Sequence, residues 1–240
     1  MIIYAHRGNS SKYPENTMLA FESAIALGAD GIETDVHLTK DGVLVITHDE
    51  EISRVSTGKG MIKDLTLEEL RQYDFGSFKG EEFSGQLIPT LDDLLDLVED
   101  NDVLLNIEIK MGFILYPGLE EKLYKKIKER GFMDRTIFSS FNHYSLAMLK
   151  EIDPTVKTGA LYQSGLYEAH NYAKTFGANA LHPYYMAFDA SLLKDCHDNN
   201  LKVNLWTVNN ANQAKAFLDM GIDGVITDYP EELINELRRK

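Results

Sequence analysis

The stretch Gly31–His48, GIETDVHLTKDGVLVITH, constrains the fold more than any other part of the chain. Gly31–Leu38 and Val43–Thr47 both have the short, β-branched composition of strands. Only Thr39–Gly42 separates them, whereas a crossover between parallel strands needs about a dozen residues. The Asp-Gly pair within this connection is typical of a hairpin turn. The sequence therefore predicts that Val43–Thr47 runs back antiparallel to the first strand.

This hairpin sets an expected register between its two strands. The expected pairs are Leu38 with Val43 and Asp35 with Ile46. Because the second strand then ends level with the middle of the first, His48 is expected to lie beside Glu33. Glu33 and His48 would thus share one site.

Outside this hairpin, short strand patterns alternate with amphipathic helical patterns along the chain. Such alternation is typical of α/β proteins with a parallel sheet, and eight strand–helix units close a barrel. The sequence therefore predicts an α/β fold, a (β/α)8 TIM barrel with an extra hairpin strand and a small insertion after strand 2. The expected barrel strands are Ile2–His6, Gly31–Leu38, Val103–Lys110, Thr136–Phe141, Lys157–Tyr162, Ala178–His182, Lys202–Thr207 and Gly224–Thr227, and the expected last helix is Pro230–Arg239.

The insertion is expected to span residues 50–89 of a single domain that comprises residues 1–240. It contains one capping-box pattern, Thr66 with Glu69, and a second such pattern, Thr90 with Asp93, follows it. A long excursion after a barrel strand is typical of a lid or specificity element above the catalytic end.

The bulk properties exclude some classes of partner. The net charge is −14, which disfavours nucleic-acid binding and anionic membrane surfaces. Cys196 is the only cysteine, so no intrachain disulfide forms. The opening MIIYAHRG lacks a leader pattern, and no apolar run approaches the roughly 18 residues of a membrane span. We expect a cytoplasmic protein with a small-molecule substrate, whose oligomeric state the sequence leaves open.

Three carboxylates form the first candidate site. Glu33 and Asp35 are two residues apart on one strand, so they share a face, and Glu108 is expected on the neighbouring strand. Carboxylates brought together in a barrel repel one another unless a cation compensates them. An oxygen-rich shell suits Mg²⁺ or Ca²⁺, although pairing with a basic side chain such as Lys110 is an equally simple explanation for each carboxylate alone.

Two histidines are expected to reach the same carboxylates. His6 ends the first strand, and the hairpin returns His48, which Asp49 is placed to orient. Imidazoles can remove and donate protons near neutral pH. Arg7, next to His6, offers a guanidinium suited to a phosphate group.

Other residues have two readings each. Asn16 is either the N-cap of the first helix or a residue near the site. Trp206, near the catalytic end of the seventh strand, either lines the substrate pocket or packs in the core. His182, at the end of the sixth strand, is a candidate substrate contact.

Six segments in this order resemble the glycerophosphodiester phosphodiesterase family, within the phospholipase C-like phosphodiesterase superfamily. They are AHRG (Ala5–Gly8), PENT (Pro14–Thr17), IETDVHLTKDG (Ile32–Gly42), THD (Thr47–Asp49), IEIK (Ile107–Lys110) and LWTVN (Leu205–Asn209). The likeness extends over nearly the whole chain, insertion included.

The resemblance implies hydrolysis of glycerophosphodiesters to sn-glycerol 3-phosphate and an alcohol. By position it implies His6 and His48 as the acid/base pair, Glu33, Asp35 and Glu108 as ligands of one divalent cation, and Arg7 and Lys110 as phosphate contacts. A lysophospholipase D-type diesterase is the first alternative, because Phe75, Phe78 and Phe83 could form an apolar rim. A non-catalytic sugar-phosphate binding barrel is the second.

Overall fold

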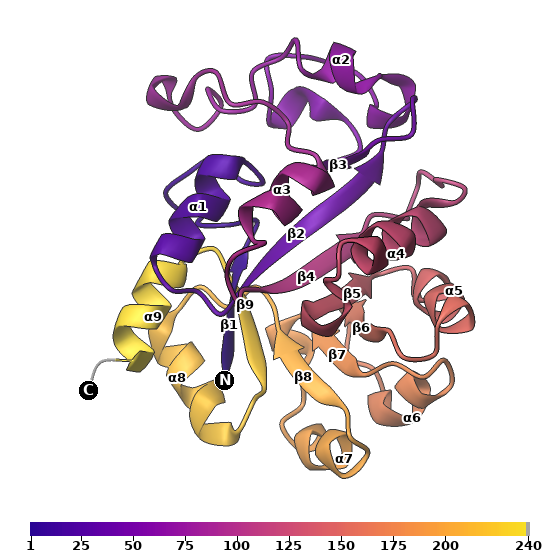
Figure 1. Cartoon of the computed structure of the whole chain (residues 1–240). Helices are drawn as coiled ribbons and strands as arrows, with labels where there is room; N and C mark the ends of the chain where they lie inside the picture. Colours follow the sequence, from indigo (N-terminus) through magenta and orange to yellow (C-terminus); the bar gives the residue numbers. More distant parts are fainter. Residues whose placement is uncertain (239–240) are drawn as a thin grey trace.

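A computed structural model describes residues 1–238 and contains a closed ring of parallel strands enclosed by helices (Figure 1). Within that range the sheet holds nine strands, and β1 pairs with both β2 and β9, which closes eight of them into a barrel. The predicted fold class is therefore confirmed. The barrel strands are β1 (Ile2–His6), β2 (Gly31–Leu38), β4 (Leu104–Ile109), β5 (Thr136–Ser140), β6 (Lys157–Tyr162), β7 (Ala180–Pro183), β8 (Lys202–Leu205) and β9 (Gly224–Thr227).

Helices follow these strands and cover the outside of the ring (Figure 1). The strand ends lie within two residues of the predicted ones, and the last predicted position of the final helix, Arg239, lies outside the described residues. The helices that pack around the barrel are α1 (Met18–Ala26), α3 (Leu91–Leu97), α4 (Leu119–Glu129), α5 (His143–Ile152), α6 (Ala169–Lys174), α7 (Leu192–Asp198), α8 (Ala211–Met220) and α9 (Pro230–Arg238).

The extra strand β3 (Leu44–Ile46) runs antiparallel to β2 outside the ring, as predicted, but the predicted register is wrong by one residue. The observed pairs are Val36 with Ile46, His37 with Val45 and Leu38 with Leu44. The reason is the turn. Thr39 N donates to Val43 O at 3.0 Å, and Gly42 takes a left-handed φ of 79°. The loop therefore has three residues with glycine at its last position, a common hairpin geometry.

The insertion packs onto β3 at the top of Figure 1 and has its own small apolar cluster. The helix α2 (Leu67–Leu70) begins at the predicted capping box of Thr66 and Glu69, and the box of Thr90 and Asp93 begins α3. One-turn 3₁₀ helices flank α2 at Ile52–Arg54, Ile62–Asp64 and Glu81–Phe83. The cluster consists of Val45, Ile52, Val55, Ile62, Leu70, Phe75 and Ile88.

The burial of Phe75 removes it from the apolar rim that the sequence suggested. Its side chain is 4% exposed, whereas Phe78 is 38% exposed. Alternation of polar and apolar residues is weak in this irregular segment, so the sequence pattern did not separate core aromatics from surface ones.

Large side chains fill the barrel interior because glycines on neighbouring strands make room for them. A Cβ atom on Gly159 would lie 2.5 Å from His182 Nε2, and one on Gly31 would lie 2.5 Å from the Tyr4 ring. His182 is fully buried, and Asn204 Nδ2 lies 2.9 Å from its Nε2. The interior is thus a packed core, as is usual for barrels of this size.

The buried His182 makes stability depend on pH. Burial lowers the pKa of His182 to about 3, from 6.5 in an accessible chain. Because the folded-state pKa is the lower one, this neutral histidine contributes stability that is fully present above pH 6.5 and is lost as the pH falls toward 3. We expect the difference in unfolding free energy between wild type and His182→Gln to change by about 2 kcal/mol between pH 7.5 and 5.0. Urea unfolding at both pH values measures this difference, and parallel pH profiles for the two proteins would contradict it.

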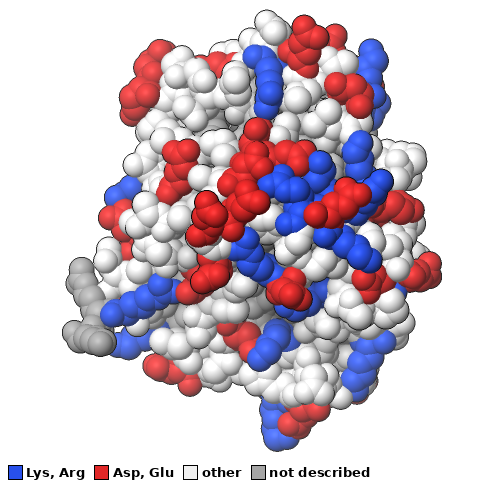
Figure 2. Space-filling view, in the orientation of Figure 1, with Lys and Arg blue, Asp and Glu red and all other residues white. Residues whose placement is uncertain are grey.

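No helix within residues 1–238 is both long and apolar enough to cross a membrane. On the face drawn in Figure 2, basic side chains alternate with acidic ones instead of forming a continuous basic area. Ion pairs such as Lys126 with Asp92 and Arg130 with Asp96 also bring opposite charges together on the helices.

Candidate active site

Two connected hollows lie at the carboxyl ends of the barrel strands. The inner one has a volume of about 80 Å³, and the outer one is a groove of about 530 Å³. His48 and Glu108 line both, so the two hollows meet at these side chains. The inner cavity is lined by His6, Arg7, Glu33, His48, Asn106, Glu108, Ser139, Leu161, Trp206, Thr207 and Ile226.

The carboxylates of Glu33, Asp35 and Glu108 come together as strand alternation predicts. Asp35 pairs with Glu108 across β2 and β4, and one oxygen from each of the three side chains lies within 4.8 Å of the others. All three residues are buried, at 3%, 1% and 8% exposure. Carboxylates that lie this close together and are this deeply buried require compensation by positive charge.

The protein supplies part of that compensation itself. Lys110 Nζ donates to Glu108 Oε1 at 2.8 Å and lies 3.4 Å from Asp35 Oδ1. Burial would raise the pKa of Asp35, but the Lys110 and Arg7 cations hold that pKa below its usual range. Burial and the neighbouring carboxylates raise the pKa of Glu33 well above its ordinary value. The two local cations, Arg7 and Lys110, thus compensate the charge of Glu33 only in part.

One oxygen of Asp35 accepts no hydrogen bond from the described residues, although Lys110 Nζ lies 3.4 Å from it. Asp35 Oδ2 accepts a hydrogen bond from Asn16 Nδ2 at 2.8 Å, whereas the buried Oδ1 has no hydrogen-bond donor among the described residues. A buried carboxylate oxygen without a donor costs folding free energy. An oxygen-only donor set with one such atom fits Mg²⁺ or Ca²⁺, and this is the observation that a cation site would explain.

His6 is held by a residue that sequence reasoning missed, Asp228. His6 Nδ1 donates to Asp228 Oδ1 at 2.5 Å, which leaves Nε2 at 3.8 Å from Glu33 Oε2. Burial would raise the pKa of Asp228, but the bonds from His6 and Asn209 lower it to about 2. The available signal was its position directly after β9, at the same end of the barrel as His6.

His48 lies where the hairpin was expected to return it, next to the carboxylates. Its Nδ1 donates to Asp49 Oδ1 at 2.6 Å, and its carbonyl oxygen lies 3.1 Å from Nε2 of the buried His37. His37 also bonds Tyr116, so it anchors the backbone of His48 instead of facing solvent.

A chain of ion pairs that the sequence did not reveal connects the two histidine segments. Arg54 donates to Asp49 Oδ2 at 2.5 Å and to both oxygens of Glu15 at 2.8 and 2.9 Å. Glu15 in turn accepts from Arg7 at 2.8 Å. Glu15 and Arg54 are 39 residues apart, and neither stands at a strand end, so strand periodicity did not predict their contact.

The remaining candidates divide between the site and the core. Trp206 lines the inner cavity and donates through Nε1 to His182 O at 2.7 Å. His182 lines neither hollow, because its ring packs against Gly159 and Asn204 in the barrel core. The N-cap of α1 is Thr17 and not Asn16, because Asn16 takes a left-handed φ of 56° and directs its side chain to Asp35 and Thr34.

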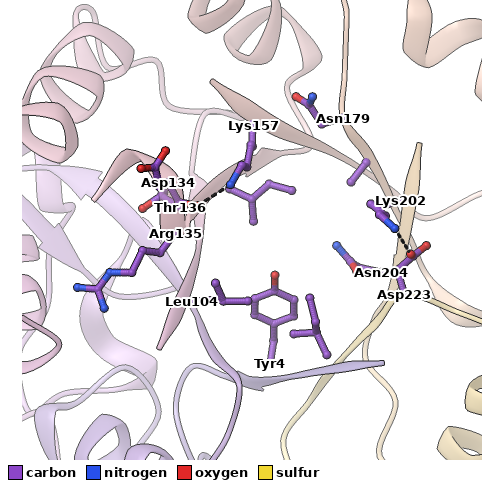
Figure 3. A pocket seen from close by; sticks show the side chains of 13 residues that line it. Tyr4, Leu104, Asp134, Arg135, Thr136, Lys157, Asn179, Lys202, Asn204 and Asp223 are labelled. Atoms are coloured by element: carbon purple, nitrogen blue, oxygen red, sulfur yellow. Dashed lines mark hydrogen bonds and ion pairs between the residues drawn. The ribbon is translucent and has the colours of Figure 1, made fainter. Parts of the chain in front are cut away.

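Another cavity, of about 380 Å³, lies at the opposite end of the barrel (Figure 3). Tyr4 points its hydroxyl into this opening. Both lysines that line the cavity already have partners: Lys157 donates to Asp134 O, and Lys202 forms an ion pair with Asp223. Its described lining contains no histidine. The groups suited to acid/base and metal chemistry therefore lie at the carboxyl ends of the strands, where barrel enzymes place their active sites.

Comparisons with known proteins agree with this geometry. The model of the glycerophosphoryl diester phosphodiesterase family matches residues 6–232. A glycerophosphodiester phosphodiesterase of Caldanaerobacter subterraneus subsp. tengcongensis is 50% identical over 238 residues, which cover 99% of this chain and 98% of that protein. A solved Oleispira antarctica phosphodiesterase, in complex with the product sn-glycerol-3-phosphate, is 30% identical and has a TM-score of 0.89. The match covers 100% of this chain and 97% of the Oleispira antarctica chain.

A solved glycerophosphodiester phosphodiesterase of Thermotoga maritima is also 30% identical, with a TM-score of 0.79 and coverage of 98% of this chain and 97% of its own. The matched range runs from His6 beyond Asp228, so it includes every side chain of the two hollows. The chain therefore belongs to the glycerophosphoryl diester phosphodiesterase family.

Proposed function

We propose that this protein hydrolyses glycerophosphodiesters to sn-glycerol 3-phosphate and an alcohol. The observation that carries the proposal is the meeting of the buried triad with His6 and His48 around one small cavity. The product named for the Oleispira antarctica relative supports the same chemistry.

Glu33, Asp35 and Glu108 would hold one divalent cation, Mg²⁺ or Ca²⁺. When bound, such a cation supplies Lewis-acid stabilisation of charge on the phosphoryl oxygens. Arg7 lines the inner cavity and Lys110 the groove, so the two cations can contact a phosphate from two sides. Both also carry charge that complements the negative transition state.

His6 and His48 act as the proton-transfer pair. Each has its Nδ1 committed to an aspartate, Asp228 or Asp49, which leaves Nε2 free to face the cavity. One imidazole removes the proton of the attacking oxygen, and the other protonates the departing alkoxide. The attacking oxygen belongs either to water or to the substrate's own glycerol hydroxyl, and trapping a cyclic phosphate in ¹⁸O-water distinguishes these routes.

A panel of diesters tests the function. Purified protein with Mg²⁺ or Ca²⁺ is incubated with glycerophosphodiesters and with lysophospholipids. Glycerol 3-phosphate is followed with a coupled enzyme, and the free alcohol is followed separately, because D-type cleavage of a lysophospholipid releases the alcohol and lysophosphatidic acid. We expect turnover of the soluble diesters. Turnover of lysophospholipids alone would identify a lysophospholipase D-type enzyme, and binding without turnover would identify the sugar-phosphate binding barrel.

Asp228→Asn should slow the reaction through His6. The amide keeps the shape of the side chain but removes the carboxylate oxygen that accepts from His6 Nδ1 and holds the tautomer of the ring, so we expect kcat to fall about 10- to 100-fold with little change in KM. Asn209→Ala is the matched control, because it removes another partner of Asp228 and leaves the bond to His6 in place. Equal kcat values for Asp228→Asn and Asn209→Ala would contradict this role.

A further inference from the structure

The outer groove leads from the carboxylate triad to loops that lie outside the barrel strands. It begins at His48 and Glu108 and ends between the start of the insertion and the loop after β4. Its lining consists of His48, Asp49, Glu50, Glu51, Arg54, Glu108, Ile109, Lys110, Met111, Gly112, Phe113, Ser140 and Phe141.

A phosphodiester placed at the triad extends in two directions. The inner cavity is bounded mainly by barrel strands, which position side chains more precisely than loops do, so it suits the glycerol phosphate part that all these diesters share. The groove is bounded by loops, which are the elements that vary in specificity on such scaffolds. The variable alcohol part therefore belongs in the groove.

The groove lining carries excess negative charge. It includes four carboxylates, Asp49, Glu50, Glu51 and Glu108, against two cations, Arg54 and Lys110. Both cations are already paired: Arg54 with Asp49 and Glu15, and Lys110 with Glu108 and Asp35. No unpaired cation of the described lining remains for an anionic alcohol group.

Glu50 is the lining carboxylate whose side chain has no hydrogen-bond or ion-pair partner among the described residues. Glu51 accepts hydrogen bonds from Ser53 and Gly60, whereas the side chain of Glu50 makes no hydrogen bond or ion pair with a described residue. Its Oε1 faces the loop after β4, since a Cβ atom on Gly112 would lie 3.9 Å from it. The half-buried carboxylate thus faces the groove without a partner.

Two exposed aromatic rings line the same groove. Phe113 is 99% exposed and Phe141 is 47% exposed. Phe141 also packs edge-on against Trp206, with ring centroids 5.4 Å apart, so it bridges the groove and the inner cavity. Aromatic faces beside a free carboxylate are the groups that bind ammonium cations, through the ring quadrupole and the opposite charge.

Resting on the proposed function, we propose that the groove binds the alcohol part of the diester and selects alcohols that carry an ammonium group. Glu50 supplies the opposite charge, and Phe113 and Phe141 supply the aromatic faces. Choline and ethanolamine have this chemistry, whereas glycerol is neutral and serine adds a carboxylate that the acidic groove repels.

The test compares kcat/KM for the glycerophosphodiesters of choline, ethanolamine, glycerol and serine. We expect wild type to prefer the choline and ethanolamine diesters about tenfold over the glycerol diester. In Glu50→Gln this ratio should fall about five- to tenfold, chiefly through KM for the cationic substrates. Phe113→Leu should lower the ratio in the same direction, and because Phe113 is fully exposed the substitution should leave folding intact.

Glu68→Gln is the matched control. It removes the same charge from an exposed glutamate of the insertion that lies outside the groove lining, so it should leave the ratio as in wild type. Equal kcat/KM for all four diesters, or an equal loss for all of them in Glu50→Gln at unchanged thermal stability, overturns the ammonium preference and leaves the proposed function standing. Failure to hydrolyse any diester overturns both.

Discussion

Asp35→Asn is expected to lower kcat/KM for a glycerophosphodiester by about a thousandfold or more. The amide occupies nearly the same volume, but it removes one negative charge from the triad and replaces one carboxylate oxygen by an amide nitrogen, which does not bind a cation. A bound divalent cation contributes several kcal/mol to stabilisation of phosphoryl charge, and each 1.36 kcal/mol is about tenfold in rate. Loss of the cation therefore accounts for a change of this size.

Two measurements check this prediction. Titration calorimetry with Mg²⁺ and with Ca²⁺ should show one site in wild type and strongly weakened binding in Asp35→Asn. EDTA should abolish wild-type turnover, and the effective cation should restore it. Asp219→Asn, an exposed position on α8, is the control for the loss of one negative charge. Full turnover after exhaustive chelation would rule out a metal-dependent mechanism.

His6→Ala and His48→Ala are each expected to lower kcat by about 10²- to 10⁴-fold, the usual contribution of one positioned proton-transfer group. Both imidazoles reach the inner cavity, and each is oriented by its own aspartate. Because the two groups serve one reaction, the double variant should lose less than the product of the two single losses.

Single-turnover and steady-state kinetics with glycerophosphocholine measure these losses. His197→Ala is the control, since this histidine lies on α7 and pairs with Asp223 at the opposite end of the barrel. Near wild-type turnover in either His6→Ala or His48→Ala would show that the reaction does not use that imidazole.

Local patterns determined much of this molecule. Strand alternation places Glu33 and Asp35 on the interior face of β2, because successive side chains of a strand point to opposite sides. The same rule places Glu108 beside them. The short connection Thr39–Gly42 permits only a hairpin, and the hairpin brings back His48.

The register of that hairpin and the role of Asn16 were harder to predict. The composition of Thr39–Gly42 is compatible with more than one hairpin loop length, and the turn geometry at Gly42 decided the register. Asn16 is as good an N-cap as Thr17 by composition. Its side chain instead bonds Asp35, a contact that exists only after β2 has docked beside the loop.

The sequence by itself thus determined the barrel, the extra strand and the grouping of the three carboxylates, because each depends on periodicity or on connection length. Only the tertiary structure revealed Asp228 behind His6, the link from Arg7 through Glu15 to Arg54, and the unpartnered Glu50 in the groove. Asp228 and His6 are 222 residues apart, and closure of the ring between β9 and β1 is what brings them into contact. No period or spacing along the chain encodes a contact of that kind.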